Sequence, residues 1–112
     1  MRWYDQLYVG ENAAIRKKKI ISSIKHHKAQ LGAYVITLPA NDQNSLEVYP
    51  AYVLLQKYYR KQDLFVVGIG LGREETFLVV QEILMDCYHR TGQFLVRKML
   101  ETDCKNKLPK TE

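Results

Sequence analysis

The sequence predicts a small three-layer α/β domain in the element order α-β-α-β-α-β, with helices on both faces of a three-stranded, mostly parallel sheet of order 1-2-3. Two observations lead to this prediction. Stretches rich in branched and aromatic residues alternate with stretches of helical period, and such alternation with short connections is typical of a parallel sheet. Residues 64–72 form the longest uncharged apolar run and end in glycines just before a helical pattern, as a buried parallel strand does. We expect this strand at the centre of the sheet.

At 112 residues the chain is long enough for one hydrophobic core. We expect a single domain over residues 1–100 and a polar, flexible tail over 101–112. No segment approaches the roughly 20 apolar residues that span a bilayer, and the first residues lack the apolar run of a secretory signal. These features predict a cytoplasmic protein with no membrane partner. The two cysteines are too few for the disulfide framework of a small secreted domain.

The N-terminal part predicts an arm followed by a helix. Residues 1–10 are rich in aromatic side chains at helical spacing, and we expect a short helix or an arm that docks on the core or on a second subunit. A helix should run from Asn12, a suitable N-cap, to about residue 30. Lysines interrupt its apolar stripe, so its second half should be the better buried. The stripe consists of Ala13, Ile20, Ile24 and Leu31.

The next part predicts a strand, a loop and a helix. Residues 33–38 are branched or aromatic throughout and favour a strand, which Pro39 stops. After a polar loop, residues 46–49 fit either a helical turn or a short extended piece. A helix is expected over 50–61, because Pro50 suits a first helical turn, where its missing N–H costs nothing.

The C-terminal part predicts a helix over 73–90 and a third strand over 93–100, with a helix over 95–100 as the alternative to that strand. The apolar residues of the helix repeat at helical spacing and define its expected buried face. This face consists of Phe77, Val80, Leu84 and Cys87, with Val79 and Ile83 beside it.

The net charge of +5 is concentrated in the segment from Glu11 to Gly32, which has six cations and one acid. The cations are Arg16, Lys17, Lys18, Lys19, Lys25 and Lys28. Such a patch predicts a surface for nucleic acid or another polyanion, bound without sequence preference. The alternative interpretation is a solvated helix face that only keeps the protein soluble.

Three glycines, Gly68, Gly70 and Gly72, stand where dinucleotide-binding proteins carry a glycine fingerprint. The third glycine of G-x-G-x-x-G would fall on Arg73, and the two glutamates after Arg73 would repel a pyrophosphate at the start of the helix. We therefore predict no nucleotide cofactor. The first two glycines should instead let a helix approach the sheet closely.

Recognisable catalytic and metal-binding patterns are missing from the sequence. It has no P-loop, no nucleophile elbow and no pair of histidines or cysteines at metal-ligand spacing. Cys87 lies on the apolar face of a predicted helix, which is typical of a small core residue. We predict no catalytic residue, no cofactor and no metal.

One small-molecule site can be proposed from the predicted topology. Parallel strands bring their carboxyl ends to one edge of the sheet, where ligands bind. The loop after the first strand and the turn after the second would then form a crevice, whose residues are Asn41, Asp42, Asn44, Ser45, Arg73 and Glu74. The alternative interpretation is a polar connection without a ligand.

The leading functional prediction is a non-catalytic interaction or regulatory module that self-associates, most simply as a homodimer. A small sheet has open edges that a partner can cover. The chain also has eight tyrosines, and tyrosine is enriched at interfaces. The alternatives are a ligand-binding domain or enzyme that uses the crevice, and a polyanion-binding protein that uses the basic helix.

Overall fold

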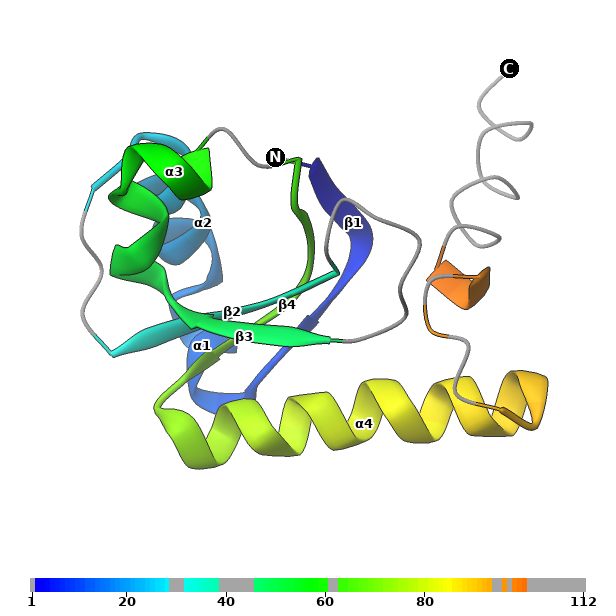
Figure 1. The fold of residues 1–112 in the computed structure, drawn as a ribbon. Coiled ribbons are helices and arrows are strands. Elements are labelled where there is room, and N and C mark those ends of the chain that lie inside the picture. Colours follow the sequence, from blue (N-terminus) through cyan, green and yellow to red (C-terminus); the bar gives the residue numbers. More distant parts are fainter. Residues whose placement is uncertain are drawn as a thin grey trace, which may run out of the picture.

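A computed structural model describes residues 2–28, 32–38, 46–60, 63–93, 96 and 98–100. At its centre lies a four-stranded mixed sheet of order β1-β4-β2-β3 (Figure 1). Its strands are β1 (Arg2–Val9), β2 (Ala33–Leu38), β3 (Glu47–Pro50) and β4 (Phe65–Leu71). β1 runs parallel to β4, whereas β2 is antiparallel to both β4 and β3. The protein is a small α/β domain, but the predicted three-stranded, mostly parallel sheet of order 1-2-3 is wrong.

β1 occupies the segment that was predicted as a helix or an arm. Trp3 and Leu7 pack against the core on one face of the sheet, and Tyr4 and Tyr8 pack on the other. Both faces of this strand are therefore covered, so its sequence lacks the alternation of a half-exposed strand. Because the intervening Asp5-Gln6 pair is polar, the four apolar positions match helical spacing equally well.

β3 lies in the segment that was predicted as either a helical turn or a short extended piece. Residues 47–49 are extended, and Pro50 both ends this strand and is the N-cap of the 3-10 helix that follows. This position is tolerated because β3 is an edge strand, where a missing N–H breaks no ladder. A 3-10 helix, η1 (Ala51–Leu55), and a short helix, α3 (Lys57–Arg60), replace the single helix predicted over 50–61.

One face of the sheet is covered by α1 (Glu11–Ile15), α2 (Lys17–Lys25) and η1. The single helix predicted over 12–30 is broken at Arg16, whose φ of −114° and ψ of 21° are not helical. Ile20 and Ile24 are buried as predicted. The N-cap of α1 is Gly10, not Asn12. Leu31 lies outside the described residues.

α4 (Arg73–Thr91) covers the other face and confirms the helix predicted over 73–90 (Figure 1). Its buried face is rotated from the predicted one and consists of Thr76, Val79, Ile83 and Cys87. Apolar residues surround more than half of this helix, so periodicity does not select a face. The contact with Gly70 selects the buried face. A Cβ built at Gly70 would lie 3.0 Å from the Thr76 Cα, which confirms that this glycine lets the helix approach the sheet closely.

Residues 93–100 do not form the predicted third strand where they are described. Val96, Lys98, Met99 and Leu100 are helical, as in the alternative interpretation, and Val96 and Leu100 are fully buried. The tail over 101–112 lies outside the described residues. None of the described helices has the length and apolarity to cross a membrane.

Candidate functional site

The edges of the sheet were the predicted place for a partner, and both are poorly suited to strand addition. Trp3 pairs with Val66 and Tyr8 with Gly68, so four residues of β1 lie opposite one of β4. This bulge interrupts the edge of β1. β3 is only four residues long and ends in proline. Bulges, short strands and proline are the devices by which proteins prevent edge-to-edge pairing.

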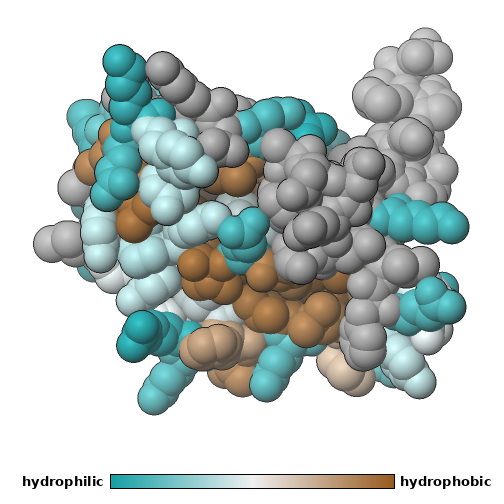
Figure 2. Space-filling model, in the orientation of Figure 1, coloured by the Kyte–Doolittle hydropathy of each residue, from teal (hydrophilic) through white to brown (hydrophobic). Residues whose placement is uncertain are grey.

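An exposed flank of α4 is a stronger candidate for an interface. Four apolar side chains follow one side of the helix at spacings of three, four and four residues. We call them the α4 stripe: Phe77, Val80, Leu84 and Tyr88. Phe77 is 64% exposed and Tyr88 49% exposed, while Val80 and Leu84 are partly buried against the core. Figure 2 shows apolar surface gathered where α4 passes below β3.

Further apolar side chains extend beyond the stripe. Leu78 and Met85, on the next side of α4, are also exposed. The helix therefore has large apolar residues on its buried face, on one flank and on part of its outer side. A helix that is apolar on most sides is normally covered on most sides. Its charges are polarised: the acids of the first turn are Glu74 and Glu75, and the basic residues of the last turn are His89 and Arg90.

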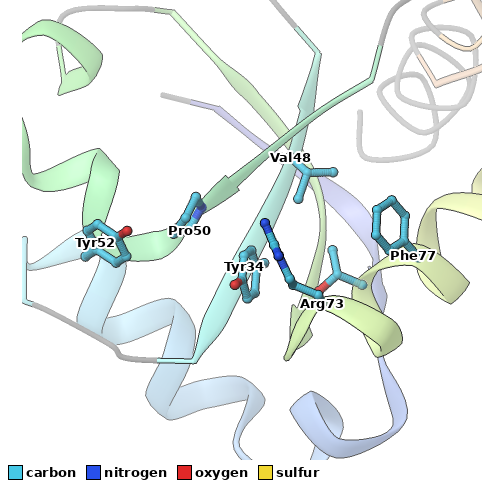
Figure 3. Close-up of a pocket in the computed structure, with 7 residues that line it drawn as sticks. Tyr34, Val48, Pro50, Tyr52, Arg73 and Phe77 are labelled. Carbon is cyan, nitrogen blue, oxygen red and sulfur yellow. The ribbon is translucent and has the colours of Figure 1, made fainter.

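A hollow of about 370 Å³ lies at the end of the sheet where β3 ends and α4 begins. It is lined by Tyr34, Val48, Pro50, Tyr52, Arg73, Thr76 and Phe77. Figure 3 shows the Arg73 side chain rising from α4 toward β3 beside Tyr34. We call this hollow the Arg73 pocket. Its lining residues come from three separate parts of the chain, so no local sequence pattern could predict it.

The crevice predicted from sequence requires the carboxyl ends of two parallel strands to lie side by side, but β2 and β4 are antiparallel. Leu38, at the carboxyl end of β2, pairs with Phe65 at the start of β4, whereas Arg73 follows the far end of β4. The two carboxyl ends are thus separated by the length of a seven-residue strand, about 20 Å. Of the predicted residues, Arg73 lines the Arg73 pocket, and Glu74 lines a second hollow beside α1. The residues Asn41, Asp42, Asn44 and Ser45 lie outside the described part of the chain.

The predicted polyanion-binding residues are all on the surface. Each of the cations Arg16, Lys17, Lys18, Lys19, Lys25 and Lys28 is exposed. Within the described residues none of them pairs with a carboxylate, since the ion pair found there joins Arg2 to Asp63. The ammonium group of Lys25 lies 5.6 Å from the centre of the Trp3 ring. The cations are therefore available to an external anion.

Glu75 has a structural role that the sequence did not indicate. Gly10 has no side chain with which to cap α1, and Glu75 of α4 takes that place. Its carboxylate accepts hydrogen bonds from the backbone N–H groups of Asn12 at 2.5 Å, Ala13 at 3.1 Å and Leu71 at 2.6 Å. Burial raises the pKa of Glu75, but these hydrogen bonds lower it more, so the net shift is downward.

A glycine is required at position 10 because a Cβ there would overlap the Glu75 side chain. Glu75 thus joins the start of α1 to the end of β4, across more than 60 residues of sequence. A second link joins β1 to α4, where the Tyr8 hydroxyl donates to Asp86 at 2.7 Å. Burial and this hydrogen bond raise the pKa of Tyr8. Both links stabilise the fold, and neither involves a residue of the α4 stripe or of the Arg73 pocket.

Among the described residues, no group of three or more histidine, cysteine or acidic side chains is arranged to hold a metal ion. Comparison with known proteins finds no matching family model, no matching curated protein and no matching solved structure. The features that bear on function are therefore the α4 stripe, the Arg73 pocket and the exposed cations.

Proposed function

We propose that this protein is a non-catalytic interaction module that self-associates through the α4 stripe. The exposure of large apolar side chains on a helix whose adjoining face is already buried carries the proposal. Contiguous apolar patches on soluble proteins mark interaction sites, and covering them contributes roughly 25 cal/mol per Å². A cytoplasmic location remains a prediction from the sequence.

A second copy of the same helix fits the stripe when the two helices run antiparallel. The aromatic residues Phe77 and Tyr88 lie at the two ends of the stripe, with smaller side chains between them. A two-fold axis near the middle of α4 would place Phe77 of one copy beside Tyr88 of the other. A two-fold interface uses the same patch on both subunits. This supports a homodimer over an open assembly.

The charges of α4 support the same orientation. In an antiparallel pair, the first turn of one helix, which includes Glu74, lies beside the last turn of the other, which includes His89. The two helix dipoles then oppose each other favourably. The helix is 19 residues long, about 28 Å. One helix pair buries less than the roughly 800 Å² per partner of a standard interface, so we expect a dissociation constant on the order of micromolar.

The self-association test introduces charge into the exposed ends of the stripe. Phe77→Glu/Tyr88→Glu should raise the dimer dissociation constant at least 100-fold, because the symmetric dimer loses four aromatic anchors that contribute roughly 1–2 kcal/mol each. The measurement is sedimentation equilibrium over a wide concentration range, with circular dichroism to confirm folding.

Ile15→Glu/Tyr58→Glu is the matched control for that variant. It makes the same charge change at apolar side chains that are 84% and 67% exposed on α1 and α3. It should dimerise like the original protein. A protein that stays monomeric at the highest concentration, or two double variants with the same dissociation constant, would contradict the proposal.

A second candidate function is sequence-independent binding of a polyanion by α1 and α2. The observation that favours it is the exposure of all six cations without a carboxylate partner among the described residues. Three of the cations, Lys17 to Lys19, occupy the first turn of α2. A helix dipole stabilises anions at that end and not cations, so these charges do not serve the helix itself.

The polyanion test uses fluorescence anisotropy with a generic DNA duplex at low and moderate salt. Lys17→Glu/Lys18→Glu should weaken binding at least tenfold and flatten the salt dependence, because fewer counterions are released for each phosphate lost. Lys57→Glu/Lys98→Glu makes the same charge change at exposed lysines elsewhere and should have a smaller effect. The absence of binding at low salt, or equal weakening in both variants, would rule out this function.

A further inference from the structure

The Arg73 pocket arises because α4 leaves part of the sheet uncovered. α4 packs mainly against β4, β2 and β1. Tyr34 of β2 pairs with Pro50 of the antiparallel β3. Val48, also on β3, remains 39% exposed. The hollow of about 370 Å³ between this surface and the start of α4 lies within the range of small-molecule sites, roughly 300–1,000 Å³.

The polar groups of the pocket favour an anion. Arg73 offers up to five N–H donors in a planar fork, and none of the described carboxylates forms an ion pair with it. Among the residues that the structure describes, no acidic side chain lines the pocket. The Thr76 hydroxyl already donates to the Gly72 carbonyl at 2.7 Å, which leaves it as an acceptor. Arg73 is therefore the group that would hold a charged ligand.

The number of charges favours a carboxylate over a phosphate. Arg73 is the single cation among the described residues that line the pocket, and two glutamates follow it directly in the chain. Their negative potential disfavours a dianion, whereas one guanidinium binds one carboxylate through two parallel hydrogen bonds. The rings of Tyr34 and Phe77 and the side chain of Val48 supply apolar surface on the remaining walls.

We infer that the Arg73 pocket binds a small organic carboxylate with an aromatic or branched apolar body, whose carboxylate pairs with Arg73 and whose body lies between β3 and α4 (Figure 3). This inference is argued from Arg73, which is not part of the α4 stripe, although Phe77 belongs both to the stripe and to the lining of the pocket. It also differs from the crevice predicted from sequence: of the described residues of that crevice, Arg73 lines the pocket and Glu74 does not.

The test is an NMR titration of the labelled full chain with N-acetyl-phenylalanine. Saturable shifts are expected for the backbone amides of Tyr34 and of residues 73–77. The neutral analogue N-acetyl-phenylalaninamide, which has the same ring without the charge, should bind at least tenfold more weakly. Arg73→Gln should lose a similar factor for the acid, because a hydrogen bond to a charged group contributes roughly 1.5–3 kcal/mol.

Arg2→Gln is the matched control, because Arg2 lies at the opposite end of β4, beside Asp63. It should bind the acid like the original protein. Phenyl phosphate serves as a third probe and should bind more weakly than the acid. The inference is overturned by non-saturable shifts, by equal affinities for the acid and the amide, by unchanged binding in Arg73→Gln, or by tighter binding of phenyl phosphate.

Discussion

Glu75→Ala is expected to lower the free energy of unfolding by about 3 kcal/mol. The substitution removes the acceptor of three backbone N–H groups, on Asn12, Ala13 and Leu71. Two of these belong to the first turn of α1, which has no side-chain cap of its own. The loss therefore combines a missing helix cap with a broken link between α1 and the end of β4. Urea unfolding, read from the midpoint at constant slope, measures it.

Glu74→Ala is the matched control for this prediction. Glu74 is the neighbouring glutamate, is exposed, and forms no hydrogen bond or ion pair within the described part of the chain. Its replacement should change the free energy of unfolding by less than about 0.5 kcal/mol. Equal losses in the two variants would show that Glu75 acts only as one more surface charge.

The original protein and Glu75→Ala should also differ in how their stability responds to acid. The hydrogen bonds to Glu75 hold its pKa below the ordinary value of 4.5. A lowered pKa in the folded state means that the carboxylate stabilises the fold above its unfolded pKa and loses this effect as the pH falls through the folded pKa. The stability difference between the original protein and Glu75→Ala should therefore be constant near neutral pH and shrink below about pH 4.5.

Gly70→Ala is expected to destabilise the protein by about 3 kcal/mol. The added Cβ would lie 2.5 Å from the Thr76 Oγ1 and 3.0 Å from the Thr76 Cα. Relief requires α4 to move away from the sheet, which also separates Val79 and Ile83 from the core. The backbone of Gly70 is not in the left-handed region, so the loss is purely steric. Thermal or urea unfolding measures it.

Gly68→Ala provides the comparison for that variant. The nearest atom to its added Cβ is the end of the Ile36 side chain at 3.1 Å, and the next is the Tyr8 carbonyl oxygen at 3.2 Å. Small shifts of these neighbours relieve the contact, so the loss should stay near 1 kcal/mol. A larger loss at Gly68 than at Gly70 would contradict the close approach of Thr76 as the cause.

Local patterns in the sequence were sufficient to predict three of the secondary-structure elements. The strand at β2, the central strand at β4 and the helix at α4 were all predicted near their observed bounds. The two strands are rich in branched and aromatic residues, the helix has apolar residues at helical spacing, and each of the three is followed by a proline or glycine. The role of Gly70 was also predicted, because a glycine between a strand and a helix signals close packing.

Other features required the whole molecule. Whether β2 runs parallel or antiparallel to β4 depends on the other strands of the sheet. Two of these, β1 and β3, are edge strands that were not predicted from the sequence. The buried side of α4 was decided by contact with Gly70, since its own apolar residues favour several faces. Neither Glu75 as the cap of α1 nor the Arg73 pocket follows from any local pattern.

The α/β class, the central apolar strand, the main helix and the basic segment could be predicted from the sequence, because each depends on residues that are near one another in the chain. The order and direction of the strands, the exposed stripe of α4 and the pocket around Arg73 became visible in the folded molecule. These depend on contacts between segments such as Tyr34, Pro50 and Arg73, which are distant along the chain. The physical reason is that periodicity reports how one element can bury its own surface, whereas a site between elements exists only after they have packed.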